Sequence, residues 1–180
     1  MGRLLALVLI VGLAGAETAT AQSASPGHAS WASLDSLFAV RAPTLDRPVP
    51  APDSVVVRAD ASPILLLAPG MVVVDGDLPE HWAEVWAFRE RHPAVSRGLH
   101  EKLDHSGYAF YRGLRLDRNT VDEVVIVSGA EGKTRINVAS VFQDDTVLRE
   151  ALSGQIALVS FGQVTFPAGE SDLLLIEVVQ

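Results

Sequence analysis

Two aspartates, Asp75 and Asp77, directly follow an apolar run in the stretch MVVVDGDLPE. An aspartate at the end of a buried strand can attack phosphorus as a nucleophile, and a neighbouring carboxylate can act as general acid. Such carboxylates also hold a divalent metal ion. The pair therefore supports one enzymatic hypothesis, a divalent-metal-dependent hydrolase of phosphatase type with Asp75 and Asp77 as its catalytic residues.

The stretch resembles the first motif of haloacid-dehalogenase-type phosphatases, in which one Asp attacks phosphorus and the next is the general acid. The resemblance implies further motif residues, and Ser128, Lys133 and the pair Asp144 and Asp145 follow in that order. Two features depart from the pattern. Ser128 and Lys133 are five positions apart, where that fold inserts helical crossovers, and Pro79 stands where the family has a Thr. We therefore keep the hydrolase as the alternative hypothesis.

The same carboxylates are candidate ligands for Ca²⁺, which takes roughly six to eight oxygen atoms. Asp75, Asp77 and Glu80 stand close together, but the patterned loop of an EF-hand is missing. Asp77 and Glu80 also have the spacing of a capping box, in which each side chain satisfies a free N–H group at a helix start. We expect helix capping here, and no cofactor.

Histidines provide a second set of candidate metal ligands, because four of the five lie between positions 81 and 105. On a helix, His100 with Asp104, and Glu101 with His105, would each lie one turn apart and could face a metal ion together. The sequence places no third ligand, and such pairs also serve as mild helix stabilisers. His100, Asp104 and His105 are therefore weak candidates for metal ligands.

The stretch VSGAEGKTRI, residues 127 to 136, ends like a phosphate-binding loop with Gly132, Lys133 and Thr134. That loop needs an earlier glycine, which would fall at Val127, and a helix after it. The residues that follow alternate as in a strand. We therefore predict a hairpin turn between two strands, with its glycines at positive φ.

Two tryptophans, Trp82 and Trp86, stand one helical turn apart. Exported proteins stack sugars on tryptophan, but a helix that lies on a sheet needs an apolar stripe of the same kind. We expect both rings to pack in the core.

The remaining periodicities predict strands, then a helix pair, then more strands. Asp77 begins the first helix, Pro93 breaks it, and the second helix spans about 94 to 105 with Val95, Leu99 and Leu103 at steps of four. Before the helices, a strand is predicted in SVVVR, and a hairpin or two buried strands at 64–74. After the helices, strands are predicted at 108–116, 121–128, 133–142, 156–166 and 172–179. One or two helical turns, capped by Asp144 or Asp145, are predicted at 143–154. Short links between strands indicate antiparallel neighbours.

These elements predict an α+β fold, with a helix pair packed on a mostly antiparallel sheet that can curl. The element order resembles cystatin-like and NTF2-like architectures. One possible binding mode is the addition of a partner's strand to the C-terminal strand LLLIEVV, which requires that this strand lie at a sheet edge. We expect so apolar a run to be central.

The N-terminus predicts export. Arg3 precedes the apolar stretch 4–16, which has the length of a signal-peptide core and is too short to span a bilayer. We expect cleavage before Gln22, with an alternative site before Glu17. The predicted divisions are a signal peptide at 1–21, a short helix and Pro-rich linker at 22–53, and one α+β domain at 54–180.

Composition narrows the function further. A net charge of −8 without a basic cluster argues against nucleic acid, and the absence of cysteine excludes thiol chemistry and disulfides. We expect a non-catalytic binding or structural module of the periplasm or cell surface. Its expected partner is either another envelope or secreted protein or a small ligand bound between the helices and the curved sheet. We expect no membrane span after signal removal, and the sequence leaves the oligomeric state open.

Overall fold

The computed structural model describes residues 37–38, 45, 55–58, 60–169 and 172–179. The expected signal peptide and almost all of the segment 22–53 lie outside these residues, so both stay predictions. The described residues form ten strands and only two α-helices, and the longer helix has nine residues. The chain is therefore built mostly of β-strands.

The elements follow in a fixed order along the chain. The strands are β1 (Val55–Arg58), β2 (Val72–Asp75), β3 (Leu99–Leu103), β4 (Tyr108–Arg115), β5 (Val121–Ser128), β6 (Lys133–Asn137), β7 (Val147–Glu150), β8 (Ile156–Leu158), β9 (Gln163–Pro167) and β10 (Leu173–Val178). The helices are the 3-10 turns η1 (Pro63–Leu67) and η2 (Glu80–Trp82), followed by α2 (Ala83–Arg91) and α3 (Pro93–Arg97).

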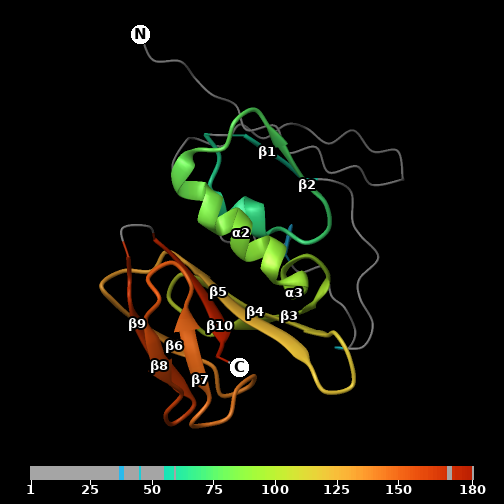
Figure 1. Ribbon diagram of the computed structural model, residues 1–180. Coiled ribbons are helices and arrows are strands. Elements are labelled where there is room, and N and C mark those ends of the chain that lie inside the picture. The colour runs from blue at the N-terminus through green and yellow to red at the C-terminus, as the bar shows by residue number, and fades with distance from the viewer. Residues whose placement is uncertain (1–36, 39–44, 46–54, 59, 170–171, 180) are drawn as a thin grey trace, which may run out of the picture.

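Six strands form one antiparallel sheet in the order β3-β4-β5-β10-β7-β8 (Figure 1). The C-terminal strand β10 lies between β5 and β7 and pairs with both. Both faces of its apolar run Leu173–Ile176 are buried, which explains why the run does not alternate. The expectation that this strand is central is confirmed, so it cannot accept a partner strand at an edge.

One face of the sheet is covered by a layer that contains β1, β2, η1 and α2, while α3 contacts β4 and β5 (Figure 1). β1 and β2 run parallel, and η1 lies in the connection between them. The buried cluster on this face includes Phe38, Leu66, Val85, Phe88, Phe110, Ile126 and Leu175. Trp82 is buried in the same cluster and Trp86 packs against it, as expected for a core-facing pair.

The opposite face is covered by the two-stranded antiparallel ribbon β6–β9. Both strands alternate strictly between exposed and buried residues, as a strand does when one side faces a core. The second cluster therefore brings Ile136, Val164 and Phe166 of the ribbon against Tyr111 and Leu174 of the sheet. The described part of the chain thus has three layers, with the six-stranded sheet in the middle.

The prediction of a helix pair on a sheet is wrong, because strands dominate and the second predicted helix does not form. Residues 94 to 97 are helical, but Leu99–Leu103 is the edge strand β3. A step of four fits a helix and also places two strand residues on one face, because four is a multiple of two. Leu99 and Leu103 accordingly pack on the same cluster.

Gly98 marks the change from helix to strand. A Cβ atom on Gly98 would lie 2.5 Å from the carbonyl oxygen of Ala94 and 2.8 Å from that of Gly113. Only glycine lets the chain pass this closely between α3 and β4.

The apolar run at 64–67 forms the 3-10 turn η1, although a strand was predicted there. Pro63 occupies the first helical position, and all four residues are buried, so their periodicity does not separate helix from strand. The predicted turn that follows is confirmed in one respect, since Gly70 has a φ of +77°.

Three further expectations about local structure are wrong. Asp77 caps no helix, because η2 begins at Glu80 after Pro79 and no side chain caps it. Residues 147–150 of the predicted helical turns form strand β7. The turn after β5 is not a hairpin turn, because β6 pairs with β9, although Gly129 and Gly132 do have positive φ.

Candidate functional site

The predicted acidic site at the end of β2 is exposed. Asp75 accepts a hydrogen bond from Arg58 Nε at 2.9 Å, and each of these side chains is about half exposed. Asp77 and Glu80 are exposed residues in the connection to η2 and in η2 itself. An ion pair so open to water contributes roughly 0–1 kcal/mol.

The other carboxylates of the hydrolase hypothesis lie in a different layer. Asp144 Oδ1 accepts a hydrogen bond at 2.8 Å from the backbone N–H of Gly162, in the connection between β6 and β7. That connection packs on the cluster beneath the β6–β9 ribbon, whereas β2 packs on the opposite face of the sheet. The structure therefore does not bring Asp75 together with Asp144 or Asp145.

The candidate histidine ligands lie on β3 and in the turn after it. His100 is buried against the ring of Phe110, with 5.1 Å between ring centroids. Asp104 is exposed, and His105 Nδ1 accepts a hydrogen bond from the N–H of Gly107 at 2.9 Å. Burial lowers the pKa of His105, although the charge of Asp104 opposes this. Among the described residues, no three His, Asp or Glu side chains gather as metal ligands do.

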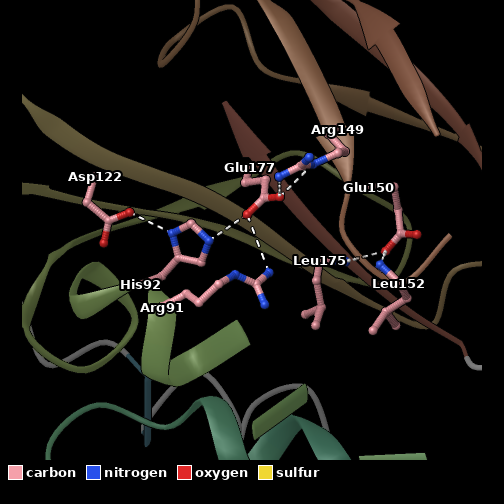
Figure 2. Close-up of polar contacts among 8 residues, drawn as sticks. All are labelled: Arg91, His92, Asp122, Arg149, Glu150, Leu152, Leu175 and Glu177. Atoms are coloured by element: carbon pink, nitrogen blue, oxygen red, sulfur yellow. Dashed lines mark hydrogen bonds and ion pairs between the residues drawn. The ribbon is translucent and has the colours of Figure 1, made fainter. Parts of the chain in front are cut away.

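The charged cluster that the structure does assemble was not predicted from the sequence, and it centres on His92, between α2 and α3 (Figure 2). His92 Nδ1 lies 2.7 Å from Asp122 Oδ1 of β5, and His92 Nε2 lies 2.6 Å from Glu177 Oε2 of β10. Glu177 also accepts a hydrogen bond from Arg149 Nε of β7 at 2.7 Å, and Arg91 lies 3.6 Å from it. We call these five residues the His92 network.

The ring of His92 lies between two carboxylates, with Asp122 at Nδ1 and Glu177 at Nε2. The guanidinium groups of Arg149 and Arg91 approach Glu177 as well. Burial alone would raise the pKa of Glu177, but hydrogen bonds from Arg149 and His92 outweigh it and the pKa lies below its ordinary value.

Each member of the network ties one layer to another. The second oxygen of Asp122 accepts the N–H of Ala94 at 2.8 Å, so a strand side chain satisfies a free donor in the first turn of α3. Glu177 joins the helical layer, through His92, to β7, through Arg149. The network contains no nucleophile, and its carboxylates are engaged by protein groups. It is therefore suited to fastening the helical layer rather than to chemistry.

Other buried charged groups also bind backbone. Arg112 is fully buried and donates to the carbonyl oxygens of Phe38 and Gly98, and burial lowers its pKa to about 10, so it stays cationic at neutral pH. Glu150 accepts hydrogen bonds from the backbone N–H groups of Leu152 and Leu175 (Figure 2). It also accepts one from the N–H of Ser153. These groups hold segments of chain in place.

A different kind of surface lies beyond the network, on the same face of the sheet. The backbone N–H of Val179 donates a hydrogen bond to the carbonyl oxygen of Val147 on β7. Val147 in turn lies opposite Leu158 of β8. In the next row, Glu177 is opposite Arg149, and Arg149 is opposite Ile156. The side chains of Ile156 and Leu158 are 62% and 57% exposed. We call Val147, Ile156, Leu158 and Val179 the open strip.

The turn after β8 adds a further exposed apolar residue. Phe161 has a φ of +52° and is 93% exposed, and Gly162 follows with a φ of +67°. Asn, Asp or Gly is the usual residue at the first of two such positions, so an aromatic residue there is an outlier. Beside the turn, residues 139 to 144 and Gly162 line an open hollow of about 560 Å³.

Sequence reasoning missed the network because its members are far apart along the chain. His92 is 30 positions from Asp122 and 85 from Glu177. The available signal was the presence of acidic residues within two apolar runs, Asp122 and Glu123 in the run that became β5 and Glu177 in the run that became β10. For the open strip, the signal was a stretch without charge, because residues 151 to 169 contain no Asp, Glu, Lys, Arg or His.

Within the described residues, no helix combines the length and the apolar character needed to cross a bilayer. No protein-family model and no curated protein matches the chain.

The chain has partial structural likeness to several glycoside hydrolases. An Anoxybacillus α-amylase has 16% identity over 64% of this chain and 30% of its own, with a TM-score of 0.47. A Nostoc punctiforme debranching enzyme has 18% identity over 65% of this chain and 30% of its own, with a TM-score of 0.39. A Thermotoga maritima α-fucosidase has 16% identity over 61% and 31%, with a TM-score of 0.34.

The chain therefore spans less than a third of the length of these enzymes. Because every one of these TM-scores is below 0.5, the likeness carries no argument about fold or activity.

Proposed function

We propose that the chain is an exported, non-catalytic binding module that docks its partner on the open strip. The observation that carries the proposal is the exposure of Ile156 and Leu158 on a sheet face whose other half is buried under the helical layer. Export rests on the apolar stretch at residues 4 to 16. The partner expected in that compartment is another envelope or secreted protein.

The apolar composition of the strip supports protein binding. Ile156 and Leu158 are neighbours on one strand, and Val147 and Val179 extend the same surface across β7 and towards β10. Contiguous apolar side chains on a surface mark interaction sites, whereas scattered single ones are ordinary. Arg149, half exposed at the border of the strip, supplies a polar rim.

The use made of the polar groups also supports binding over catalysis. In the His92 network and around Glu150, the carboxylates are bonded to groups of the protein itself. The acidic residues suggested by the sequence are exposed and are distributed over two layers. No observation therefore favours the hydrolase.

Site-directed photo-cross-linking in the producing cells tests the proposal. A benzoylphenylalanine at position 158 places the reactive group in the open strip, and the same group at position 71 is the control. Met71 is also apolar and 60% exposed, but it precedes β2 in the layer with the helices. We expect protein cross-links from position 158 and few from position 71. Equal yields from the two positions, or none from position 158, would contradict the proposal.

A further inference from the structure

Within the described residues, the outer edge of β8 carries backbone groups that no neighbouring strand pairs. The backbone N–H of Glu150 donates a hydrogen bond to the carbonyl oxygen of Gln155, and the backbone N–H of Val159 donates one to that of Thr146. The backbone groups of residues 155 and 159 therefore face β7. Antiparallel pairing alternates, which turns Ala157 towards β7 and the N–H and C=O groups of Ile156 and Leu158 away from it. Among the described residues, no strand pairs with β8 on that side.

This edge lacks the usual protection against strand pairing. Soluble proteins guard edge strands with charged residues, proline or bulges. The opposite edge strand, β3, carries Glu101 and Lys102. β8 has the sequence Ile-Ala-Leu, and the uncharged stretch around it runs from 151 to 169.

We propose that a second copy of this chain pairs with β8, antiparallel, about a two-fold axis at Ala157. The inference rests on the proposed docking surface and names its occupant. In this register Ile156 lies opposite Leu158 of the partner subunit, and Leu158 opposite Ile156 of the partner subunit. Each of these two pairs exchanges two backbone hydrogen bonds, because the backbone groups of residues 156 and 158 face outwards. The six-stranded sheet becomes a continuous sheet across both copies.

The side chains of β8 also fit this antiparallel pairing of two copies. Ile156 and Leu158 project from the same face, so four apolar side chains from two copies form one cross-strand patch. Within each copy, Val147 and Val179 extend that patch along the row of Leu158. A two-fold interface must be complementary to itself, and an apolar strand of this length meets that condition in the antiparallel register.

The distribution of charge favours a second copy over a different protein. Each copy carries a net charge of −8, so two copies repel each other through most of their surfaces. The stretch 151 to 169 carries no charge, which makes it the surface where two copies approach with the least repulsion. A different partner for so acidic a chain would be attracted by acidic surface, which the β8 edge does not offer.

Sedimentation equilibrium of the purified chain tests the pairing. We expect a concentration-dependent dimer. Ile156→Lys introduces a charge at an exposed side chain and leaves the pairing of Ala157 with β7 intact, so it should raise the dimer dissociation constant about tenfold or more. Met71→Lys makes the same change in charge at an exposed apolar residue away from β8 and should leave that constant unchanged.

Cysteine cross-linking tests the register, because the chain has no cysteine of its own. Ile156→Cys and Leu158→Cys are made separately and mixed under mild oxidation. The two-fold axis at Ala157 places residue 156 opposite residue 158, so the mixture should form the disulfide-linked heterodimer faster than either variant forms its homodimer. Homodimers that form as fast as the heterodimer would overturn the register.

The results separate this inference from the proposed function. A wild-type chain that stays monomeric at about 100 µM, a concentration well above a micromolar dissociation constant, would overturn pairing between copies. Unaltered association of Ile156→Lys would do the same. If position 158 then still cross-links to another protein in cells, the binding module stands and only its partner changes. If position 158 cross-links to nothing, both proposals fail.

Discussion

On one face of the six-stranded sheet, β4, β5 and β10 carry apolar side chains under the helical layer, whereas β7 and β8 carry similar side chains in the open. Leu175 on β10 is fully buried, and Leu158 on β8 is more than half exposed. The two leucines point to the same side of the same sheet. Their surroundings differ because the helical layer ends near β10, where Glu177 binds His92 on one side and Arg149 on the other.

We call the part of this face on β7 and β8 the open half. Its exposed apolar residues are not explained as part of the core of a single chain. In the covered half, the large side chains of the sheet belong to one buried cluster with residues of the helical layer. In the open half, the described chain provides no such layer. A second chain that covers this half would bury the remaining apolar surface, which is the basis for the docking proposal.

The largest effect should come from truncating matched leucines in the two halves. Leu175→Ala should lower the free energy of unfolding by about 2–5 kcal/mol, because it leaves a cavity in the core. Leu158→Ala should lower it by less than about 1 kcal/mol in dilute solution, since the side chain is already exposed. Urea denaturation at low protein concentration measures both values. Equal losses would show that the open half is covered within one chain.

The next effect should come from the border between the halves. Glu177→Gln removes the charge shared by His92, Arg149 and Arg91. It should cost about 2–4 kcal/mol, because the mostly buried His92 loses a counter-ion and the buried side chain at 177 loses its charged hydrogen bonds. Arg58→Gln, in the exposed pair with Asp75, should cost less than about 1 kcal/mol. Thermal unfolding of the two variants compares a buried pair with an open one. A Glu177→Gln variant as stable as wild type would show that the network does not fasten the helical layer.

The pH dependence of stability follows from the same carboxylate. The pKa of Glu177 is lower in the folded chain than in the unfolded chain. Its contribution is therefore complete above the ordinary glutamate pKa and is lost as the pH falls through the folded value. We expect the difference in stability between wild type and Glu177→Gln to be constant near neutral pH and to shrink below about pH 4.3. A difference that is unchanged down to pH 3 would contradict this expectation.

The smallest effect should come from the turn beyond β8. Phe161→Asn replaces an exposed aromatic residue at positive φ with a residue that tolerates this conformation. It should stabilise the chain by about 0.5–1 kcal/mol. Phe161→Ala, which removes the ring without supplying that tolerance, is the control and should give no such gain. Stability that falls with Asn would show that the ring makes a stabilising contact in the folded chain.

Sequence reasoning found most of the strands because β4, β5 and β10 of the central sheet, and β6 and β9 of the ribbon, have strong apolar or alternating patterns. It failed at β3, where a leucine spacing of four fits both a helix and a strand. It also failed at β7, where two aspartates resembled a helix cap. Asp145 instead has a φ of +68° in a turn, and Asp144 binds Gly162.

The functional surfaces were harder to predict than the strands. The His92 network depends on four parts of the chain, namely the α2–α3 junction, β5, β7 and β10, which approach only in the folded chain. The spacing of residues in one sequence does not show that approach. The open strip depends on something else, namely which half of the sheet the helical layer covers. That choice follows from strand order, which the spacing of apolar residues does not encode.

Amide hydrogen exchange tests most directly whether the open half lies uncovered in a single chain. It should be measured by NMR on the purified chain, residue by residue and at several protein concentrations. We predict that the amides of Val125 and Leu175, at the centre of the sheet, exchange slowly at every concentration. The amides of Ile156 and Leu158 should exchange fast in dilute solution and become protected as the concentration rises. Strong protection of Ile156 and Leu158 in the dilute chain would contradict the account, because it would mean that the β8 edge is already paired within one molecule.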